Sequence, residues 1–442
     1  MRKQSLSITT FCIISLFSCS TNRGSDDYHQ NEEGLIKINI GTSINKERPS
    51  FKLSEVVDSI KIIPLQETNV SIVGKIMDIQ VIDEDYYIAS NTSSGLLRFN
   101  SGGFFENSIG KQGQGPDEYV RMLNYFIDKE KKEINIISTI KGIQTYDRTG
   151  NHIRYNPNFK IGSIMRQTIT KLYSFKEKLI MEESGQFLPN NVVEADSIWQ
   201  FALLDSSFVV YKKFYNPSHK GNEEEIISHP VSMNSLPISW IEEKPSVDFY
   251  NNEMWIKYPD VDTLYKFNSK NENIESKYYL DYGNLTRTDH MSYNVVPKEK
   301  SAFYNLRLFS FYNTHDYFYF VGNKSDDIYT FQYSKKTGRV IINKRKGLLY
   351  QSNIRFDNGN KSWAIKRDFI LKNDICGGQF RVDFTCGNYW VFVLTHESIE
   401  DVLQLKEADV KDITLFTRLK EEVERMRNND DANPILMVAK LK

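Results

Sequence analysis

The sequence predicts an all-β protein, a six-bladed β-propeller with four-stranded blades and a short helical element near its C-terminus. Three observations support this prediction. An aromatic-rich strand pattern recurs six times, most copies are followed by a second strand with a polar turn, and single alternating strands stand at both ends. The composition agrees, because the 442 residues include 27 Phe, 25 Tyr and 5 Trp, and aromatic side chains are enriched in strands.

The repeated unit begins with a charged or Asn-containing turn and continues as an aromatic or β-branched run. Alternating Tyr, Ile, Phe and Val side chains fit a half-buried pleated surface. A second strand follows every copy except the last, which precedes helix-like sequence. The six copies span 83–90, 131–138, 176–183, 251–258, 314–322 and 386–394, and the second strands span 96–105, 143–153, 201–210, 263–274 and 328–340.

The polar turns indicate how the hairpins close. The segments Asn100–Gly103, Asp147–Gly150 and Lys335–Gly338 each supply a glycine for the positive φ that a tight turn requires. Six units that cannot bury their faces alone favour a radial stack of sheets. A two-sheet sandwich with many hairpins is the alternative, and it accommodates six copies less well.

Strands at both ends of the chain are expected to close the ring. Residues 35–40 (LIKINI) and 434–441 (PILMVAKL) alternate like strands, and we expect both to seal the last blade, which removes an exposed sheet edge. Between Ser398 and Arg427 the apolar residues recur near helical spacing. We expect one or two helices packed on the last blade as a structural cap. A partner-binding helix is the alternative.

The N-terminus is typical of a targeting segment. Arg2 and Lys3 precede an apolar stretch over 8–17, which is too short for a membrane-spanning helix. This stretch ends in Leu-Phe-Ser-Cys19, which resembles the bacterial lipobox, whose cysteine is lipidated. A plain secretory signal with an incidental cysteine is the alternative. The predicted division is a lipoprotein signal peptide over 1–18, a flexible tether over 19–34 and the propeller with its helix and closing strand over 35–442.

These features predict a lipid-anchored protein of the cell envelope, at the outer membrane on its periplasmic or surface face. The membrane is therefore one expected partner, through the lipid on Cys19. Lys and Arg number 56 against 57 Asp and Glu, so the net charge of −1 gives no basic field for nucleic acid. A glycan, a peptide or an envelope protein remains as the expected ligand.

The cysteines of the predicted propeller leave two alternatives open. Cys376 and Cys386 lie ten residues apart in an exported chain, so they form a disulfide or remain two free thiols. A metal pair is not expected, because no second Cys/His pair has zinc spacing. We expect no cofactor, and no catalytic motif of the HExxH or GxSxG type is present.

The segment 62–128 carries a family resemblance. Its start (IPLQET), a strand ending in RFNSGG and the run GKQGQGPDEY at 110–119 are similar to the 6-bladed β-propeller lipoproteins of Bacteroidetes, and so is the ending NPIL at 433–436. The resemblance covers roughly 35–442. Asp117 stands where the family usually has glycine, and Asp tolerates left-handed geometry better than most residues. The resemblance implies the fold and an exported location, and it assigns no catalytic residue.

Four sequence features are candidates for contact with a ligand. The glycine-rich run 110–116 lacks the order of a phosphate-binding loop, so we expect a turn between blades, with Glu118 accepting backbone N–H bonds and Tyr119 packed beneath it. Arg121 follows this connection and is expected to point at the central channel. Trp240 and Trp363 lie in the long inserts 216–250 and 347–374, where binding sites concentrate on rigid scaffolds.

Two main classes of function follow. The first is a ligand-binding or interaction propeller on the cell envelope, with Arg121, Trp240 and Trp363 as ligand contacts. The alternative is an extracellular glycan- or peptide-processing enzyme with its site at the propeller channel. A polar cluster at the channel mouth would favour the enzyme, and an aromatic pit would favour binding. A structural partner of an outer-membrane complex is a third class, and fold alone does not decide among them.

Overall fold

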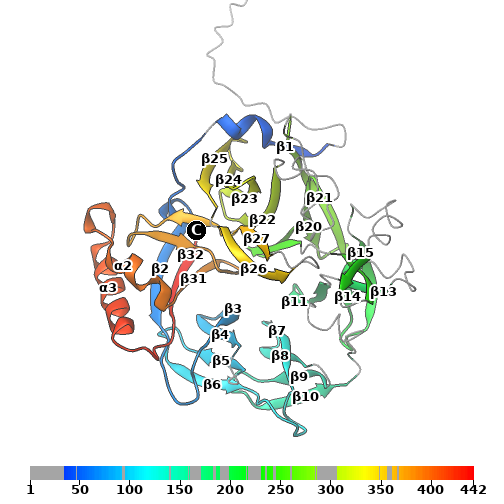
Figure 1. The fold of residues 1–442 in the computed structure, drawn as a ribbon. Helices are drawn as coiled ribbons and strands as arrows, with labels where there is room; N and C mark the ends of the chain where they lie inside the picture. Colours follow the sequence, from blue (N-terminus) through cyan, green and yellow to red (C-terminus); the bar gives the residue numbers. More distant parts are fainter. Residues whose placement is uncertain are drawn as a thin grey trace, which may run out of the picture.

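The computed structural model shows a closed ring of blades around a central axis (Figure 1). The predicted signal peptide over 1–18, Cys19 and the predicted tether up to residue 33 lie outside the described residues. The structure describes residues 34–442 except 46, 92–94, 139–140, 158, 160–170, 183–185, 190–198, 216, 218–229, 234–235, 242–244, 259–260, 284, 286–305, 348, 356–360 and 366–367.

The ring consists of six antiparallel four-stranded blades, as the sequence predicts, and the first-named strand of each blade lies innermost and the last outermost. Blade 1 is β3 (Ile76–Ile82), β4 (Asp85–Ser90), β5 (Leu96–Phe99) and β6 (Phe105–Ile109), and blade 2 is β7 (Met122–Asp128), β8 (Glu133–Ser138), β9 (Gly142–Tyr146) and β10 (His152–Asn156). Blade 3 is β11 (Lys171–Phe175), β12 (Lys178–Glu182), β14 (Trp199–Leu204) and β15 (Val210–Tyr215).

Blades 4 to 6 follow the same plan. Blade 4 is β18 (Ser246–Tyr250), β19 (Glu253–Lys257), β20 (Thr263–Asn268) and β21 (Asn273–Asp281), and blade 5 is β22 (Arg307–Asn313), β23 (Tyr317–Lys324), β24 (Asp327–Ser334) and β25 (Val340–Lys346). Blade 6 is β30 (Phe384–Cys386), β31 (Tyr389–Leu394), β32 (Ile435–Leu441) and β2 (Val57–Pro64). Five of the six predicted repeats contain the whole second strand of their blade, and the repeat 314–322 contains the first six of the eight residues of β23.

The hydrophobic core is divided among the interfaces between blades. Among the described residues, the buried apolar side chains form six clusters, one at each blade–blade interface. The second strands are buried on both faces because each lies between two neighbouring sheets. Trp255 and Trp390, which the repeat pattern places in strands, are core residues with 5% and 0% of their surface exposed.

The ring is closed by strands from distant parts of the chain. β32 pairs with β2 in antiparallel register from Val57↔Leu441 to Pro64↔Ile435, so the prediction for residues 434–441 is confirmed. The prediction that residues 35–40 also seal the last blade is wrong. β1 (Ile36–Asn39) instead adds to the outer edge of blade 4, parallel to β21.

The apolar face of β1 explains this placement. Ile38 and Ile40 are fully buried, and they join the cluster between blades 4 and 5 together with Leu280 and Leu308. From there the chain runs past blade 5, where Arg48 N–H donates to Ile342 O at 2.7 Å, before it becomes β2. Two 3₁₀ helices lie on this path, η1 (Gly41–Asn45) and η2 (Leu53–Glu55).

The predicted helical element packs on the flank of blade 6 (Figure 1). It comprises η7 (His396–Ser398), α2 (Ile399–Leu403), η8 (Glu407–Asp409) and α3 (Ile413–Arg427). The buried face of α3 joins the cluster of β2 and β32 through Phe416, Leu419 and Val423, which is the arrangement expected of a structural cap. The longest described helix has 15 residues, and none of the described helices has the length and apolarity that a membrane crossing requires.

The two ends of the ring differ. In an antiparallel blade, the turns after the first and third strands lie at one end, and the connections after the second and fourth strands lie at the other. The first kind are tight: the turns at 83–84, 176–177 and 251–252 each have two consecutive residues with positive φ, the geometry of type I′ hairpins. We call this the hairpin end.

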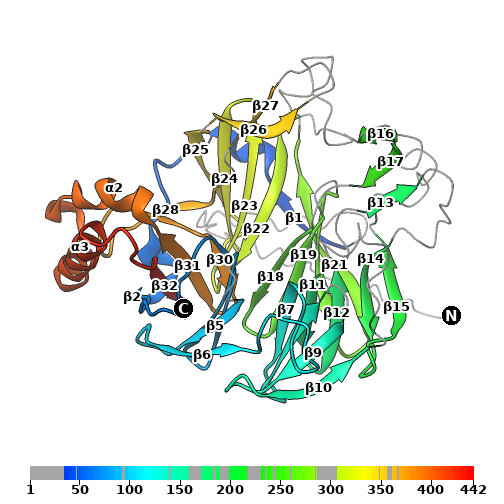
Figure 2. The same cartoon turned by 60° about the horizontal axis from the view of Figure 1, so that its bottom comes forward.

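The opposite end carries the insertions, and we call it the insert end (Figure 2). β13 follows the second strand of blade 3, β16 and β17 follow its fourth strand, and these three form one small sheet. Two hairpins, β26–β27 and β28–β29, follow the fourth strand of blade 5. The bounds are β13 (Gln186–Pro189), β16 (Pro230–Met233), β17 (Leu236–Ile241), β26 (Leu349–Arg355), β27 (Lys361–Ile365), β28 (Ile370–Lys372) and β29 (Gln379–Arg381).

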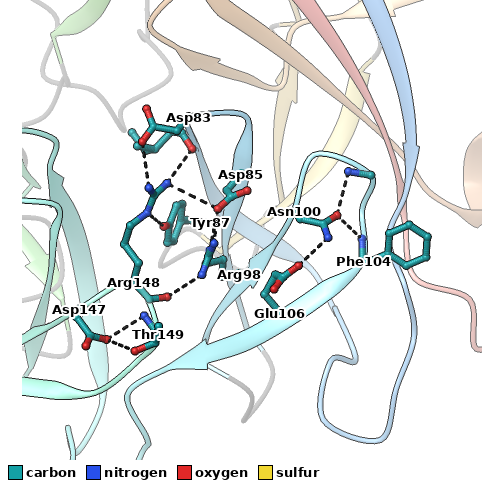
Figure 3. Close-up of polar contacts among 12 residues, drawn as sticks. Asp83, Asp85, Tyr87, Arg98, Asn100, Phe104, Glu106, Asp147, Arg148 and Thr149 are labelled. Carbon is teal, nitrogen blue, oxygen red and sulfur yellow. Dashed lines mark hydrogen bonds and ion pairs between the residues drawn. The ribbon is translucent and has the colours of Figure 1, made fainter.

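Polar contacts hold neighbouring blades together at the hairpin end. Arg148, in the turn between β9 and β10, donates to the Tyr87 hydroxyl and to the Asp83 carboxylate of blade 1, both at 3.0 Å (Figure 3). Arg98 donates to Asp85 at 2.8 Å within blade 1 and to the Arg148 carbonyl at 3.1 Å. These arginine contacts therefore join blade 1 to blade 2.

Closure by β2 predicts the effect of a substitution. Ile62, on β2, is fully buried in the cluster that also contains residues of β32 and α3, so Ile62→Ala should lower the free energy of unfolding by about 2–5 kcal/mol. The adjacent Lys61 is exposed, and Lys61→Ala should cost less than about 1 kcal/mol. Urea denaturation of both variants measures the difference. Equal small losses would contradict the role of β2 in closing the ring.

Candidate functional site

A polar pocket lies on the axis, bordered by the inner strands of blades 3 to 6. Its volume is about 230 Å³. β13 begins four residues after the wall residue Glu182, and β17 ends four residues before the wall residue Pro245, so the insertion sheet is tied to the pocket wall. The lining comprises Lys171, Tyr173, Glu182, Pro245, Ser246, Val247, Ser310, Phe311, Tyr312, Val382, Asp383, Phe384 and Thr385.

Blade 3 contributes a carboxylate that is already hydrogen-bonded. Glu182, at the end of β12, is 2% exposed, and it accepts a short hydrogen bond from the Tyr173 hydroxyl. Burial, together with the negative charge of Glu182, raises the pKa of Tyr173 well above its ordinary value, so this hydroxyl keeps its proton. Lys171 lies directly opposite Glu182 in the strand register, and its side chain is exposed.

Blade 6 contributes a second carboxylate. Asp383 accepts from Arg381 Nε at 2.5 Å and from the Val393 amide at 2.9 Å. Burial raises the pKa of Asp383, and these two donors oppose that rise. Like Glu182, Asp383 accepts hydrogen bonds from the protein's own groups.

Beneath the pocket, Asp248 ties three blades together. Its carboxylate, on β18, accepts from the backbone N–H of Asn313 in blade 5 at 2.6 Å and is hydrogen-bonded by the Thr385 side chain of blade 6. Asp248 is 2% exposed, and this burial raises its pKa to about 7. Lys335 donates to Asn313 Oδ1 at 2.7 Å, and burial lowers the pKa of Lys335 to about 8.

A second group of contacts joins blades 6, 1 and 2 on the other side of the axis. The Cys386 thiol donates to Ile79 O at 2.9 Å, and the Tyr125 hydroxyl donates to Tyr87 O at 3.0 Å. The same hydroxyl contacts the carboxyl of Asp78, whose pKa is raised by burial. Together with the Asp248 contacts, these bonds link the inner strands of all blades except blade 3.

Arg121, Trp240 and Trp363, the ligand contacts predicted from the sequence, lie outside the described pocket lining. Arg121 is exposed at the residue before β7, at the insert end. Trp240 lies in β17 and Trp363 in β27. The structure describes the strands at these two positions but not the side chains. All three stay predictions.

The two cysteines are free thiols in this structure. Cys376 belongs to the buried cluster of blades 5 and 6, whereas Cys386 packs against the cluster of blades 6 and 1. This arrangement corresponds to the alternative of two free thiols and not to the disulfide. Among the described residues, no group of three or more His, Cys, Asp or Glu side chains is placed to hold a metal ion.

The glycine-rich run is a turn between blades 1 and 2, which confirms the structural interpretation. Glu118 accepts from the Gly115 amide at 2.8 Å, and this bond lowers the pKa of Glu118. Tyr119 is buried beneath the turn. Lys141 Nζ donates to the carbonyls of Gln114 and Glu118 at 3.0 Å. These contacts hold the turn in place with the protein's own groups.

Sequence reasoning missed the pocket carboxylates. Glu182 and Asp383 are 201 positions apart, as their numbers show, and only the ring brings them to one cavity. The sequence did show two other carboxylates of the inner strands. Asp78 and Asp248 interrupt otherwise apolar or aromatic runs (IMDIQ and VDFY). A carboxylate inside such a strand must find a partner when it is buried.

The raised pKa of Asp248 predicts a pH dependence. Between its unfolded value near 4 and its folded value of about 7, the folded protein binds a proton that the unfolded chain has released. Stability should therefore fall as pH rises from about 4 to about 7. Asp248→Asn should remove this part of the slope, and the exposed Asp430→Asn should not. Melting curves from pH 4 to 8 give the test, and parallel profiles for all three proteins would contradict it.

Comparison with known proteins agrees with this fold. A family model described as "Domain of unknown function (DUF4934)" matches residues 35–440. No curated protein matches the sequence significantly. A Bacteroides fragilis protein provisionally described as exported has a similar structure, with a TM-score of 0.55 and 16% identity over 92% of this chain and 99% of that one. At that identity the likeness shows the fold alone.

Other solved structures are more distant. The extracellular domain of a protein provisionally described as a hybrid two-component system, from B. thetaiotaomicron, has 13% identity and a TM-score of 0.35, covering 73% of this chain and 33% of that one. Virginiamycin B lyase from Staphylococcus aureus has 9% identity and a TM-score of 0.34, covering 74% and 85%. Neither likeness is close enough to support an argument about this chain.

Proposed function

Because the chain belongs to the DUF4934 family, whose description assigns no activity, we propose its function from the site itself: it is a ligand-binding propeller of the cell envelope. The observation that carries the proposal is the polar pocket, which is lined by the inner strands of four blades and whose walls connect to the insertion sheet. Binding residues concentrate on connections that a rigid scaffold positions.

The composition of the pocket supports selective binding. The residues around the cavity include the hydroxyl-bearing Tyr173, Ser310 and Tyr312 and the acidic Glu182 and Asp383, together with aromatic and aliphatic residues. Ligand sites commonly combine apolar walls with a few fixed polar groups. Arg121, Trp240 and Trp363 belong to the proposal as contacts at the insert end for the part of the ligand outside the pocket.

The first test is a thermal-shift screen of the protein without its signal peptide, with glycan fragments and peptides as probes. A ligand at 100 times its Kd should stabilise the protein by about 2.7 kcal/mol. Glu182→Gln should abolish the shift, whereas Lys131→Ala, which changes an exposed side chain at the hairpin end, should retain it. A ligand that binds both variants equally would place binding outside the pocket.

A second candidate function is an enzyme acting on extracellular glycan or peptide. The observation that favours it is the group of three buried or partly buried carboxyls, Glu182, Asp383 and Asp248, of which the last has a pKa near neutrality. Titratable groups with shifted pKa values tend to cluster at active sites. Mass spectrometry of any ligand after incubation separates the two functions: an unchanged ligand supports binding, and a cleaved ligand supports catalysis.

The envelope location is part of the proposal. The lipobox-like sequence before Cys19 and the polar residues 20–33 support a lipid anchor with a tether, and the exported description of the B. fragilis protein is consistent with it. In bacteria expressing the full chain, the protein should partition into the detergent phase of a Triton X-114 extract. Cys19→Ala should move it to the aqueous phase. An aqueous wild-type protein would contradict the lipid anchor.

A further inference from the structure

We propose that the axial pocket takes a small organic anion, whose carboxylate pairs with the ammonium group of Lys171. This inference rests on the proposed binding function and names the ligand class. Three observations carry it: the position of Lys171 in the pocket wall, the partners of the other polar groups in that wall, and the size of the cavity.

Lys171 brings an exposed positive charge to the pocket. It is the first residue of β11, the inner strand of blade 3, so it lies at the insert end, where β11 begins. Its side chain is exposed. Glu182 is directly opposite in the strand register, yet within the described part of the chain Lys171 forms no hydrogen bond or ion pair. Its three N–H donors therefore remain for a ligand.

The acidic side chains of the wall are engaged by the protein. Glu182 is 2% exposed and accepts from the Tyr173 hydroxyl. Asp383 forms an ion pair with Arg381, with 2.5 Å between Nε and Oδ1. These negative charges are buried or paired, whereas the ammonium of Lys171 is exposed. The charge most accessible to a ligand in this wall is therefore positive.

The hydroxyl groups of the wall also have partners within the protein. Each is hydrogen-bonded to a group of a described residue: Tyr173 to Glu182, Ser246 to the Phe311 backbone, Tyr312 to Ser310 and Thr385 to Asp248. A neutral ligand would have to compete with these bonds. An anion that binds Lys171 would replace only water on the ammonium.

A single carboxylate suits this pocket better than a larger or more highly charged anion. The volume of about 230 Å³ is below the range of about 300–1,000 Å³ that is usual for drug-sized ligands. Phosphate groups are commonly held by several backbone N–H groups at a helix N-terminus, and Lys171 is the one cationic side chain in the described lining. The nearby Glu182 and Asp383 disfavour additional negative charges on the ligand.

The experiment is saturation-transfer NMR of the protein without its signal peptide. The probes are uronic acids, aldonic acids, hydroxy acids and N-acetyl amino acids, each compared with the neutral sugar or amide of the same skeleton. At least one carboxylate should bind with a Kd of about 10 mM or tighter, and its neutral counterpart should bind at least tenfold more weakly. An increase in NaCl from about 0.05 to about 0.5 M should weaken the carboxylate, because salt screens ion pairs that solvent can reach.

Variants of Lys171 test the residue itself. Lys171→Met should weaken the carboxylate at least tenfold, Lys171→Arg should retain it within about threefold, and the matched control Lys131→Ala at the hairpin end should leave it within twofold. The salt dependence and the neutral counterparts are measured on the unaltered protein, so the test does not depend on the folding of any variant.

Three results would overturn the inference: no carboxylate of the panel binds at about 50 mM, a neutral counterpart binds as tightly as its carboxylate, or Lys171→Met leaves binding unchanged. The proposed function has a separate outcome. A neutral ligand whose binding is lost in Glu182→Gln but kept in Lys171→Met overturns the anion assignment and preserves the ligand-binding pocket.

Discussion

The pairing of β2 with β32 is the constraint on which the rest of the structure depends. Each blade buries its faces only against two neighbours, so an open ring would expose the apolar faces of two blades. Seven residue pairs in β2 and β32 join strands almost 380 positions apart, and α3 covers the outer side of this junction. The N-terminal strand β1 also covers an exposed sheet edge, because it pairs with the outermost strand of blade 4.

A closed ring with antiparallel blades makes its two ends unequal. The hairpin end is fixed by tight turns and by contacts such as those of Arg148 with blade 1. The insert end is where the chain can lengthen without disturbing a blade, and the insertions between blades 3 and 4 and between blades 5 and 6 lie there. The pocket is lined mainly by the inner strands of the blades, and two of its lining residues, Glu182 and Pro245, lie four residues from strands of the insertion sheet. The scaffold itself therefore forms the site, and the insertions border it.

Local sequence patterns predicted the fold because each blade of a propeller has a similar pattern of strands and turns. The predicted turn glycines Gly103 and Gly150 do have positive φ, and a Cβ at either would lie within 2.4 Å of a carbonyl oxygen of the preceding blade. The placement of β1 was not predictable in this way, since its alternation suits any open edge. Nor were Glu182 and Asp383, whose strands carry no local sign that they share a cavity. The candidate site combines side chains from several blades, whereas a local sequence pattern identifies the strands of one blade only.

The central claim is that ligand binding occurs in the axial pocket at the insert end. A crystal structure of the protein with a bound ligand from the screen tests it most directly. The account predicts ligand density between Glu182 and Asp383. Density at the hairpin end or on the flank of α3, with an empty axial pocket, would contradict it.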